Sequence, residues 1–429
     1  MTSAQTVTDT LIVGAGQAGI AMSEHLSRLA VPHLVLERGR IAERWRSNRW
    51  DSLVANGPAW HDRFPGMEFD DLQPNDFASR DRIAAYFEAY ARKYEAPIRT
   101  GVEVTSVERI PGRADFRVQT SQGEIRARRV VVATGAFQTP VIPPIAPQSP
   151  SIQQIHSANY RNPEQLHPGA VLVVGAGSSG VQIADELQRA GRQVYLSVGP
   201  HDRPPRAYRG LDYCWWLGVL GEWDKATPAE GREHVTIAVS GVRGGETIDF
   251  RKLGHRGITL VGMTTDFSGG VARFDGRLSE YVQRGDENHF AVLDAADAYA
   301  ARNGLDLPEE PSARALLPSP ECMTNPLREL DLAEANVNAI VWATGYTSDY
   351  SWVHLNAFDA EGKPLHQRGI SVEPGLYFVG LSWLSRRGSA FIWGVWHDAK
   401  HIADHIGIQR NYLAYEAACR REATALASS

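Results

Sequence analysis

Residues 11–19 read Leu-Ile-Val-Gly-Ala-Gly-Gln-Ala-Gly, and the architecture can be worked out from this short stretch. An apolar run enters a turn with three glycines, and an apolar pattern with helical spacing follows in residues 20–29. Residues 33–36 predict a second strand, which ends in Glu37. A strand, a glycine turn, a helix and a second strand closed by an acid form the fingerprint of a dinucleotide-binding βαβ unit.

Each glycine of this fingerprint has a separate task. We expect Gly14 to make the tight turn, Gly16 to let the backbone approach a pyrophosphate, and Gly19 to allow close packing of the helix. The helix N-terminus presents unpaired N–H groups to the phosphates. Glu37 stands at the spacing of an acid that contacts a ribose hydroxyl.

The same pattern occurs a second time. Residues 171–180 read Val-Leu-Val-Val-Gly-Ala-Gly-Ser-Ser-Gly, a helical pattern continues from Val181, and residues 193–198 predict the next strand. Two fingerprints, each in the right context, imply two dinucleotide sites. The cofactor pairing that requires both is a flavin dinucleotide with a nicotinamide dinucleotide.

A further duplication supports this prediction. Residues 130–135 and 340–345 are each an apolar run that ends in Ala-Thr-Gly, which predicts a buried strand that turns beneath a cofactor. The chain is therefore predicted to be an α/β protein with two Rossmann-like domains, one for FAD and one for NAD(P)H. Its expected parts are an FAD domain in 1–145 and 335–429, a linker in 146–164, and a nicotinamide domain in 165–334 with a helical insertion at about 277–325.

Composition excludes several classes of protein. The 429 residues include 44 Lys and Arg against 50 Asp and Glu, so the basic excess of a nucleic-acid binder is missing. No apolar run approaches the roughly 18 residues of a membrane span. The cysteines Cys214, Cys322 and Cys419 are too far apart for a CxxC pair or a four-ligand zinc site, so we expect no metal. We expect a cytoplasmic protein and leave a homodimer open.

At this point the chain resembles the flavin-containing monooxygenases, or class B flavoprotein monooxygenases, above all bacterial members and the plant enzymes of auxin synthesis. Besides the two fingerprints, residues 156–161 (His-Ser-Ala-Asn-Tyr-Arg) resemble the second half of the family's linker motif, although Pro150 and Ile152 stand where its Phe and Gly are expected. Baeyer–Villiger enzymes typically carry Trp at the position of Tyr160. The resemblance also implies the glutathione-reductase-like arrangement of two dinucleotide-binding domains.

Residues 51–58 resemble the family segment Ser-x-x-x-Asn, and this resemblance implies a catalytic role for Asn56 beside the flavin. An uncharged amide can donate a hydrogen bond to a flavin hydroperoxide without supplying a proton. Residues 375–380 resemble the last strand of the flavin domain, with a helix expected to begin near Phe391. The FAD contacts that we predict are Gly14, Gly16, Gln17, Ala18, Gly19, Glu37, Arg38, Trp45, Thr134, Gly135, Thr344, Gly345, Gly380 and Ser389.

The second fingerprint bears on the choice of nicotinamide coenzyme. No acid ends the strand after it, and an acid there would repel a 2′-phosphate. We therefore predict NADPH, with NADH left open because Gly199 stands where many family members have Arg. The predicted contacts are Gly175, Gly177, Ser178, Ser179, Gly180, Ser197, Arg203 and Arg206.

The resemblance implies a monooxygenase that reduces FAD with NADPH, forms a flavin C4a-hydroperoxide, and passes one oxygen atom of O₂ to a small organic substrate, by N- or S-oxygenation or a related reaction. Three alternatives stay open at this stage. They are Baeyer–Villiger oxygenation of a ketone, a reductase that uses FAD and NAD(P)H without oxygenation, and a nucleotide-binding protein without catalysis. The absence of a CxxC pair argues against a disulfide reductase.

Overall fold

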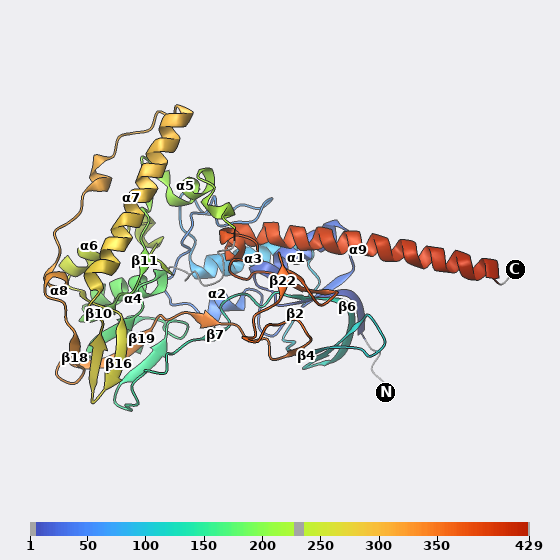
Figure 1. Cartoon of the computed structure of the whole chain (residues 1–429), viewed down its shortest axis with the longest axis horizontal. Coiled ribbons are helices and arrows are strands. Elements are labelled where there is room, and N and C mark those ends of the chain that lie inside the picture. Colours follow the sequence, from blue (N-terminus) through green and yellow to red (C-terminus); the bar gives the residue numbers. More distant parts are fainter. Residues whose placement is uncertain (1–5, 227–235, 428–429) are drawn as a thin grey trace.

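The computed structural model describes residues 6–226 and 236–427, with side chains through Arg420. Its strands form two main sheets, one in each half of the molecule in Figure 1. The first sheet has the order β21-β4-β5-β6-β1-β2-β3, and β24, β23 and β22 extend from β6. Its strands are β1 (Thr6–Val13), β2 (His33–Glu37), β3 (Ile98–Thr100), β4 (Val104–Arg109), β5 (Phe116–Thr120), β6 (Gly123–Val132), β21 (Val353–His354), β22 (His366–Gln367), β23 (Ile370–Ser371) and β24 (Leu376–Phe378).

The parallel centre of the first sheet carries the first fingerprint. β1 pairs in parallel with β2 and with β6, and β24 pairs in parallel with the other side of β6. The glycine turn after β1 leads into α1 (Gln17–Arg28), which packs against α9 (Ile392–Ala427). The predicted βαβ unit is therefore confirmed, and the strand predicted within residues 375–380 belongs to the same sheet. The other helices of this half are α2 (Glu43–Ser47) and α3 (Arg80–Lys93).

The second sheet is wholly parallel and carries the second fingerprint. Its order is β15-β10-β9-β19-β8, formed by β8 (Gln153–His156), β9 (Ala170–Val174), β10 (Val194–Ser197), β15 (Thr259–Val261) and β19 (Val337–Trp342). Alternate side chains of β9 enter two different cores. One core lies under α4 (Ser178–Arg189), α6 (Phe250–His255) and the start of α7 (Leu278–Asn303), and the other lies under β16 (Thr264–Ser268), β17 (Val271–Phe274) and β18 (Glu329–Asp331).

The strand pairing corrects two of the boundaries expected from the sequence. β8 falls inside the expected linker 146–164, yet it pairs with β19 and is the edge strand of the second sheet. β19 falls inside 335–429, yet it pairs with β9. The chain therefore returns to the first sheet only after Trp342, through a two-stranded ribbon of β7 (Thr139–Pro140) and β20 (Tyr346–Thr347). An apolar run ending in Ala-Thr-Gly suits either sheet, and only the pairing distinguishes them.

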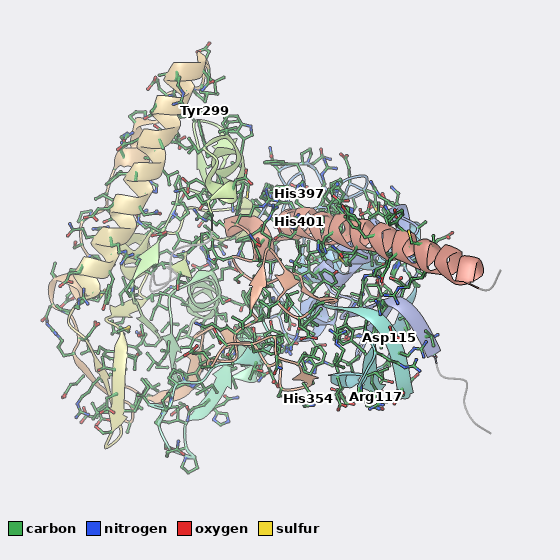
Figure 2. The ribbon with its side chains drawn as sticks, turned by 45° about the vertical axis from the view of Figure 1, so that its right-hand side comes forward. Asp115, Arg117, Tyr299, His354, His397 and His401 are labelled. Carbon is green, nitrogen blue, oxygen red and sulfur yellow. The ribbon has the colours of Figure 1, made fainter. Side chains whose placement is uncertain are left out.

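Two long helices give the molecule its outline. α7 forms the first part of the expected insertion, packs against β11 (His201–Asp202), and reaches outward with Tyr299 near its far end (Figures 1 and 2). α9 begins at Ile392, one residue from the expected start, and runs beyond the first sheet (Figure 1). No helix within residues 6–226 and 236–427 is long and apolar enough to cross a membrane. The remaining short elements are α5 (Tyr213–Val219), α8 (Glu321–Thr324), β12 (Ala207–Tyr208), β13 (Leu211–Asp212) and β14 (Thr236–Ile237).

Candidate functional site

The first glycine turn has the geometry of a pyrophosphate cradle. Gly14 adopts a φ of +109°, and a Cβ atom there would lie 2.7 Å from the Ala133 carbonyl oxygen. A Cβ atom on Gly19 would lie 1.8 Å from the Gly14 carbonyl oxygen, so helix and turn are in direct contact. A Cβ atom on Gly16, by contrast, would meet nothing within 4 Å apart from its chain neighbours. The space before the N-terminus of α1 is open, which fits the pyrophosphate of FAD.

Glu37 lies beside this cradle. Its carboxylate accepts hydrogen bonds from the Ala15 N–H at 2.9 Å and from the Gly39 N–H at 2.8 Å. The strand end is thereby held against the glycine turn, where the ribose of a dinucleotide follows the pyrophosphate. Arg38 is exposed, and its guanidinium lies 3.9 Å from the Glu103 carboxylate.

The last part of the chain comes back to the same helix N-terminus. The Gln17 side-chain amide donates to the Ala390 carbonyl at 2.8 Å. Gly380 has a φ of +82°, and a Cβ atom there would lie 2.7 Å from the Ala18 Cβ. Ser389 is fully buried, and its hydroxyl accepts the Ser385 N–H at 3.0 Å. The structure thus brings together predicted FAD contacts that are more than 360 residues apart in the chain.

The two Ala-Thr-Gly segments occupy equivalent places. The carbonyl of Ala133 faces Gly14, and the carbonyl of Ala343 faces Gly175. A Cβ atom on Gly175 would lie 2.5 Å from the Ala343 carbonyl oxygen. Thr134 accepts a hydrogen bond from the Gln138 amide at 3.0 Å, and the same amide donates to the carbonyl of Gly135. The Thr344 hydroxyl donates to the Val141 carbonyl, and His156 contacts the carbonyl of Gly345 at 2.9 Å. Each segment therefore closes the back of one glycine turn.

The second glycine turn differs from the first in one respect. Gly175 has a φ of +102°, and Gly180 contacts Gly175 as Gly19 contacts Gly14. The space in front of Gly177 is filled, however, because a Cβ atom there would lie 2.3 Å from the Cγ2 of Thr236. The Ser178 hydroxyl donates to the Ile237 carbonyl at 2.8 Å and accepts the Val239 N–H at 3.2 Å. Ser179 follows in the first turn of α4.

The predicted 2′-phosphate contacts have partners inside the protein. Arg203 is buried and donates to Asp286 at 2.9 and 2.6 Å, and Arg206 is buried and donates to Asp212 at 2.7 Å. The hydroxyl of Ser197 is buried and donates to the Gly262 carbonyl at 3.0 Å. This placement corrects the sequence-based assignment. Both guanidinium groups are engaged by carboxylates in the interior and do not face solvent as phosphate ligands would.

Asn56 lies between the two halves of the molecule. Its side-chain oxygen accepts the Gln182 amide at 2.9 Å, and its carbonyl accepts a hydrogen bond from Arg206. Gln182 belongs to α4 of the second domain, whereas Asn56 belongs to the loop after α2 in the first. Trp45, another predicted contact, packs against the cores of both domains. No local pattern could identify Gln182, because its partner Asn56 is 126 residues away in the chain.

The residues of the linker motif have structural partners. His156 is buried, accepts the Ala158 N–H on Nδ1 at 3.1 Å, and donates from Nε2 to Gly345. Burial lowers the pKa of His156, which keeps the ring neutral. The Tyr160 hydroxyl donates to Glu186 at 2.7 Å, and burial next to this carboxylate raises the pKa of Tyr160. The motif thus fastens the linker to β20 and α4.

An aromatic cluster that the sequence did not predict lies next to Asn56 in the chain. The ring of His61 stacks on Trp223 with centroids 5.4 Å apart and meets Trp60 and Trp393 edge-on, each at 5.3 Å. His61 is oriented by Asp62 at 2.8 Å. These rings come from the first domain, the second domain and α9, so no local pattern could group them. Trp396, in contrast, lies outside this cluster, since its ring packs against His25 at 4.3 Å and its indole N–H donates to the Glu24 carboxylate at 2.8 Å.

The comparisons with known proteins agree with this geometry. The model of the pyridine nucleotide-disulphide oxidoreductases matches residues 11–208. An uncharacterized CzcO-like oxidoreductase of Geobacillus kaustophilus is 35% identical, covering 94% of this chain and 99% of the relative. A probable indole-3-pyruvate monooxygenase of Arabidopsis thaliana is 26% identical, covering 93% and 89%. The solved flavin-containing monooxygenase of Stenotrophomonas maltophilia has the same fold, with a TM-score of 0.65 and 20% identity over 94% of this chain and 99% of that one.

The fold and the open cradle define a flavin-dependent oxidoreductase built from two dinucleotide-binding domains. At 35% identity over nearly the whole length, the chain belongs to the CzcO-like oxidoreductases. The wider family uses FAD and NAD(P)H. Within residues 6–226 and 236–420, no group of three or more His, Cys, Asp or Glu side chains is placed to hold a metal ion.

Proposed function

We propose that this chain is an FAD-dependent, NADPH-consuming monooxygenase that transfers one oxygen atom from O₂ to a small organic substrate, by N- or S-oxygenation or a related reaction. The observation that carries the proposal is the open space at Gly16, flanked by Glu37 and backed by Ala133, in a chain whose second half repeats the same unit. The distant likeness to a probable indole-3-pyruvate monooxygenase favours oxygenation over simple reduction.

The chain's own residues would bind and orient the cofactor. The N-terminus of α1 offers unpaired N–H groups to the pyrophosphate, and Glu37 would meet the ribose. The bond between Gln17 and Ala390 holds the loop before α9 at the same end of the sheet. The N-terminus of α9 carries partial positive charge and would favour negative charge on a ring system bound there. Bound FAD would supply hydride acceptance and the activation of O₂.

The aromatic cluster around His61 suits the wall of a site that excludes water. Trp60, Trp223 and Trp393 surround the imidazole, and Tyr213 and Leu217 belong to the same buried group. A dry wall protects an oxygenating site from the wasteful release of H₂O₂. Next to it, Asn56 and Gln182 offer uncharged amide groups, which can orient oxygen atoms without donating a proton to them.

Thiol chemistry finds no support in the cysteines. Cys214 is buried, and this burial raises the pKa of its thiol well above the usual range, so it stays protonated. Cys322 is half-buried against the second domain, where burial also raises its pKa, and Cys419 lies on the outer part of α9. A disulfide reductase that passes electrons through its own cysteines needs a reactive thiol beside the flavin. This argues for oxygenation rather than disulfide reduction.

The test measures where the electrons and oxygen atoms go. Purified holoprotein would be mixed with NADPH under ¹⁸O₂ in the presence of a thioether, a tertiary amine, a 2-oxo acid or a ketone. We expect one substrate class to gain one ¹⁸O atom per NADPH oxidised, with less H₂O₂ than without substrate. Recovery of all electrons as H₂O₂ with every substrate class, or anaerobic NADPH oxidation sustained by a disulfide, would show that the proposal is wrong.

A further inference from the structure

The two glycine turns are matched in sequence and backbone, yet only one of them is open. In both turns the first glycine has a φ above +100°. A Cβ atom on the third glycine would lie 1.8 Å from the carbonyl oxygen of the first in both turns. The middle glycines differ. The space before Gly16 is empty to 4 Å, and the space before Gly177 holds the methyl group of Thr236 at 2.3 Å. The middle glycine is the position where a dinucleotide backbone approaches its pyrophosphate.

Thr236 is held there by its neighbours. β14 pairs in parallel with β11, and the Ala238 N–H donates to the Asp202 carbonyl at 2.8 Å. Ser178, the first residue of α4, uses its hydroxyl to bind both Ile237 and Val239. The segment Thr236–Val239 therefore engages the glycine turn and the helix N-terminus that a pyrophosphate would need.

We propose that Thr236–Val239 holds the second dinucleotide site closed, and that NADPH enters only after this segment leaves the N-terminus of α4. The inference rests on the proposed function in that it takes NADPH as the ligand. A pyrophosphate and the Thr236 side chain require the same volume, so the closed and the loaded states exclude each other. The coenzyme must therefore bind an open state that is only partly populated. Its apparent dissociation constant is the intrinsic one divided by the fraction of molecules in the open state.

The closed segment also contacts the flavin domain. Gln182 shares its side-chain amide between the Val239 carbonyl and Asn56, at 2.9 Å each. Two residues further on, a Cβ atom on Gly241 would lie 2.2 Å from the Ala55 carbonyl oxygen, so this backbone lies directly against the loop that carries Asn56. Withdrawal of the segment removes one of the two acceptors of Gln182. Opening of the coenzyme site is thus transmitted to the Asn56 loop through the Gln182 side chain and through the backbone contact of Gly241.

The closed contact can be tested without any coenzyme. In FAD-loaded protein, Gly177→Ala places a methyl group against the Cγ2 of Thr236, whereas the Cβ of Thr236 is 3.8 Å away and would be tolerated. We expect Gly177→Ala to lower the melting temperature by about 2–6 °C. Adding Thr236→Ala should restore at least half of this loss, and Thr236→Ala alone should change little. A Gly177→Ala protein as stable as the wild type, or no recovery in the double variant, would overturn the closure.

The opening is tested with NADP⁺ by hydrogen exchange and titration calorimetry on the same FAD-loaded protein. If the segment leaves, saturating NADP⁺ speeds exchange of the Ala238 and Val239 amides, and Thr236→Ala tightens NADP⁺ binding by about threefold or more. Slower exchange of these amides on binding, unchanged affinity, or no binding to either protein would overturn the proposal. The proposed function fails separately, if NADPH does not reduce the bound FAD at any concentration.

Discussion

The side-chain amide of Gln182 donates to the side-chain oxygen of Asn56 at 2.9 Å, across the boundary between the two dinucleotide-binding domains. Gln182 is buried and lies one turn into α4. Among the described residues, Asn56 is the one side chain of the first domain with which it forms a hydrogen bond. The loop that contains Asn56 continues directly to His61 and its aromatic cluster. This hydrogen bond therefore joins α4 of the second domain to the loop that carries the aromatic cluster around His61.

If Asn56 supports the reaction with O₂, Asn56→Ala should leave FAD content and anaerobic reduction by NADPH nearly intact. Removing a partner from a buried polar pair costs about 1–3 kcal/mol, equivalent to a roughly 5- to 150-fold faster loss of the oxygenating state. H₂O₂ released per NADPH oxidised should therefore rise. Gln182→Ala should raise it as well, and Asn303→Ala on the exposed end of α7 should not. Unchanged H₂O₂ yield in folded, flavin-loaded Asn56→Ala would remove the assigned role.

The first glycine turn predicts that two neighbouring substitutions fail in different ways. Gly16→Val points into open space, so the protein should fold normally and yet be colourless, because the side chain occupies the pyrophosphate position. Gly19→Ala places a methyl group 1.8 Å from the Gly14 carbonyl and should destabilise the fold itself, by about 1–3 kcal/mol or more. The flavin-to-protein absorbance ratio and the melting temperature distinguish the two outcomes. Yellow, FAD-replete Gly16→Val protein would contradict the site.

Features set by local spacing could be predicted from the sequence. The two glycine turns, the strand that ends at Glu37 and the strand that ends at Trp342 each depend on residues within about 30 positions of one another. The fingerprint fixes the backbone conformation at Gly14 and Gly175 through sterics alone, and both have the positive φ that this requires. These are the parts of the fold that the structure confirms.

Features set by distant partners could not be predicted. Arg203 looks like a free basic residue in the sequence, and its partner Asp286 is 83 positions away on α7. Ile237, in the segment that closes the second turn, is 59 positions from its partner Ser178, and this segment has no motif of its own. The assignment of 335 as the domain boundary failed for the same reason, because strand partners are chosen across the whole chain. Long-range packing, not local propensity, decides such positions.

The buried pairing of Arg203 changes what its substitution should do. The sequence alone predicts a selective loss of NADPH use, whereas the structure predicts a loss of stability that affects NADPH and NADH alike. Breaking a buried ion pair costs about 3–5 kcal/mol, and the value should fall at the lower end because Arg251 also contacts Asp286. Urea unfolding of Arg203→Ala measures this loss, and Arg284→Ala, at an exposed position of α7 near Asp286, is the control. A normal unfolding midpoint with NADPH-selective loss would instead support Arg203 as a contact of the 2′-phosphate.

Two buried histidines predict that the fold weakens in mild acid. Burial lowers the pKa of His25 and of His201 to about 4 each. Both stay neutral in the folded state, while the unfolded chain takes up their protons below about pH 6.5. The unfolded state then binds more protons, so the free energy of unfolding falls as the pH drops from about 6.5 toward 4. Each histidine contributes at most about 1.4 kcal/mol per pH unit in this window.

His201 allows this prediction to be isolated from the titration of carboxylates. Its Nδ1 donates to the Gly199 carbonyl at 2.9 Å, and its buried Nε2 has no partner, so protonation would leave a charge in the interior next to Arg203. His201→Gln keeps a donor but cannot take up the proton. Its free energy of unfolding, measured in urea at several pH values, should fall less steeply between pH 6 and 4.5 than that of the wild type. Exposed His167→Gln should keep the full slope. Equal slopes for His201→Gln and wild type would show that this ring does not carry the acid sensitivity.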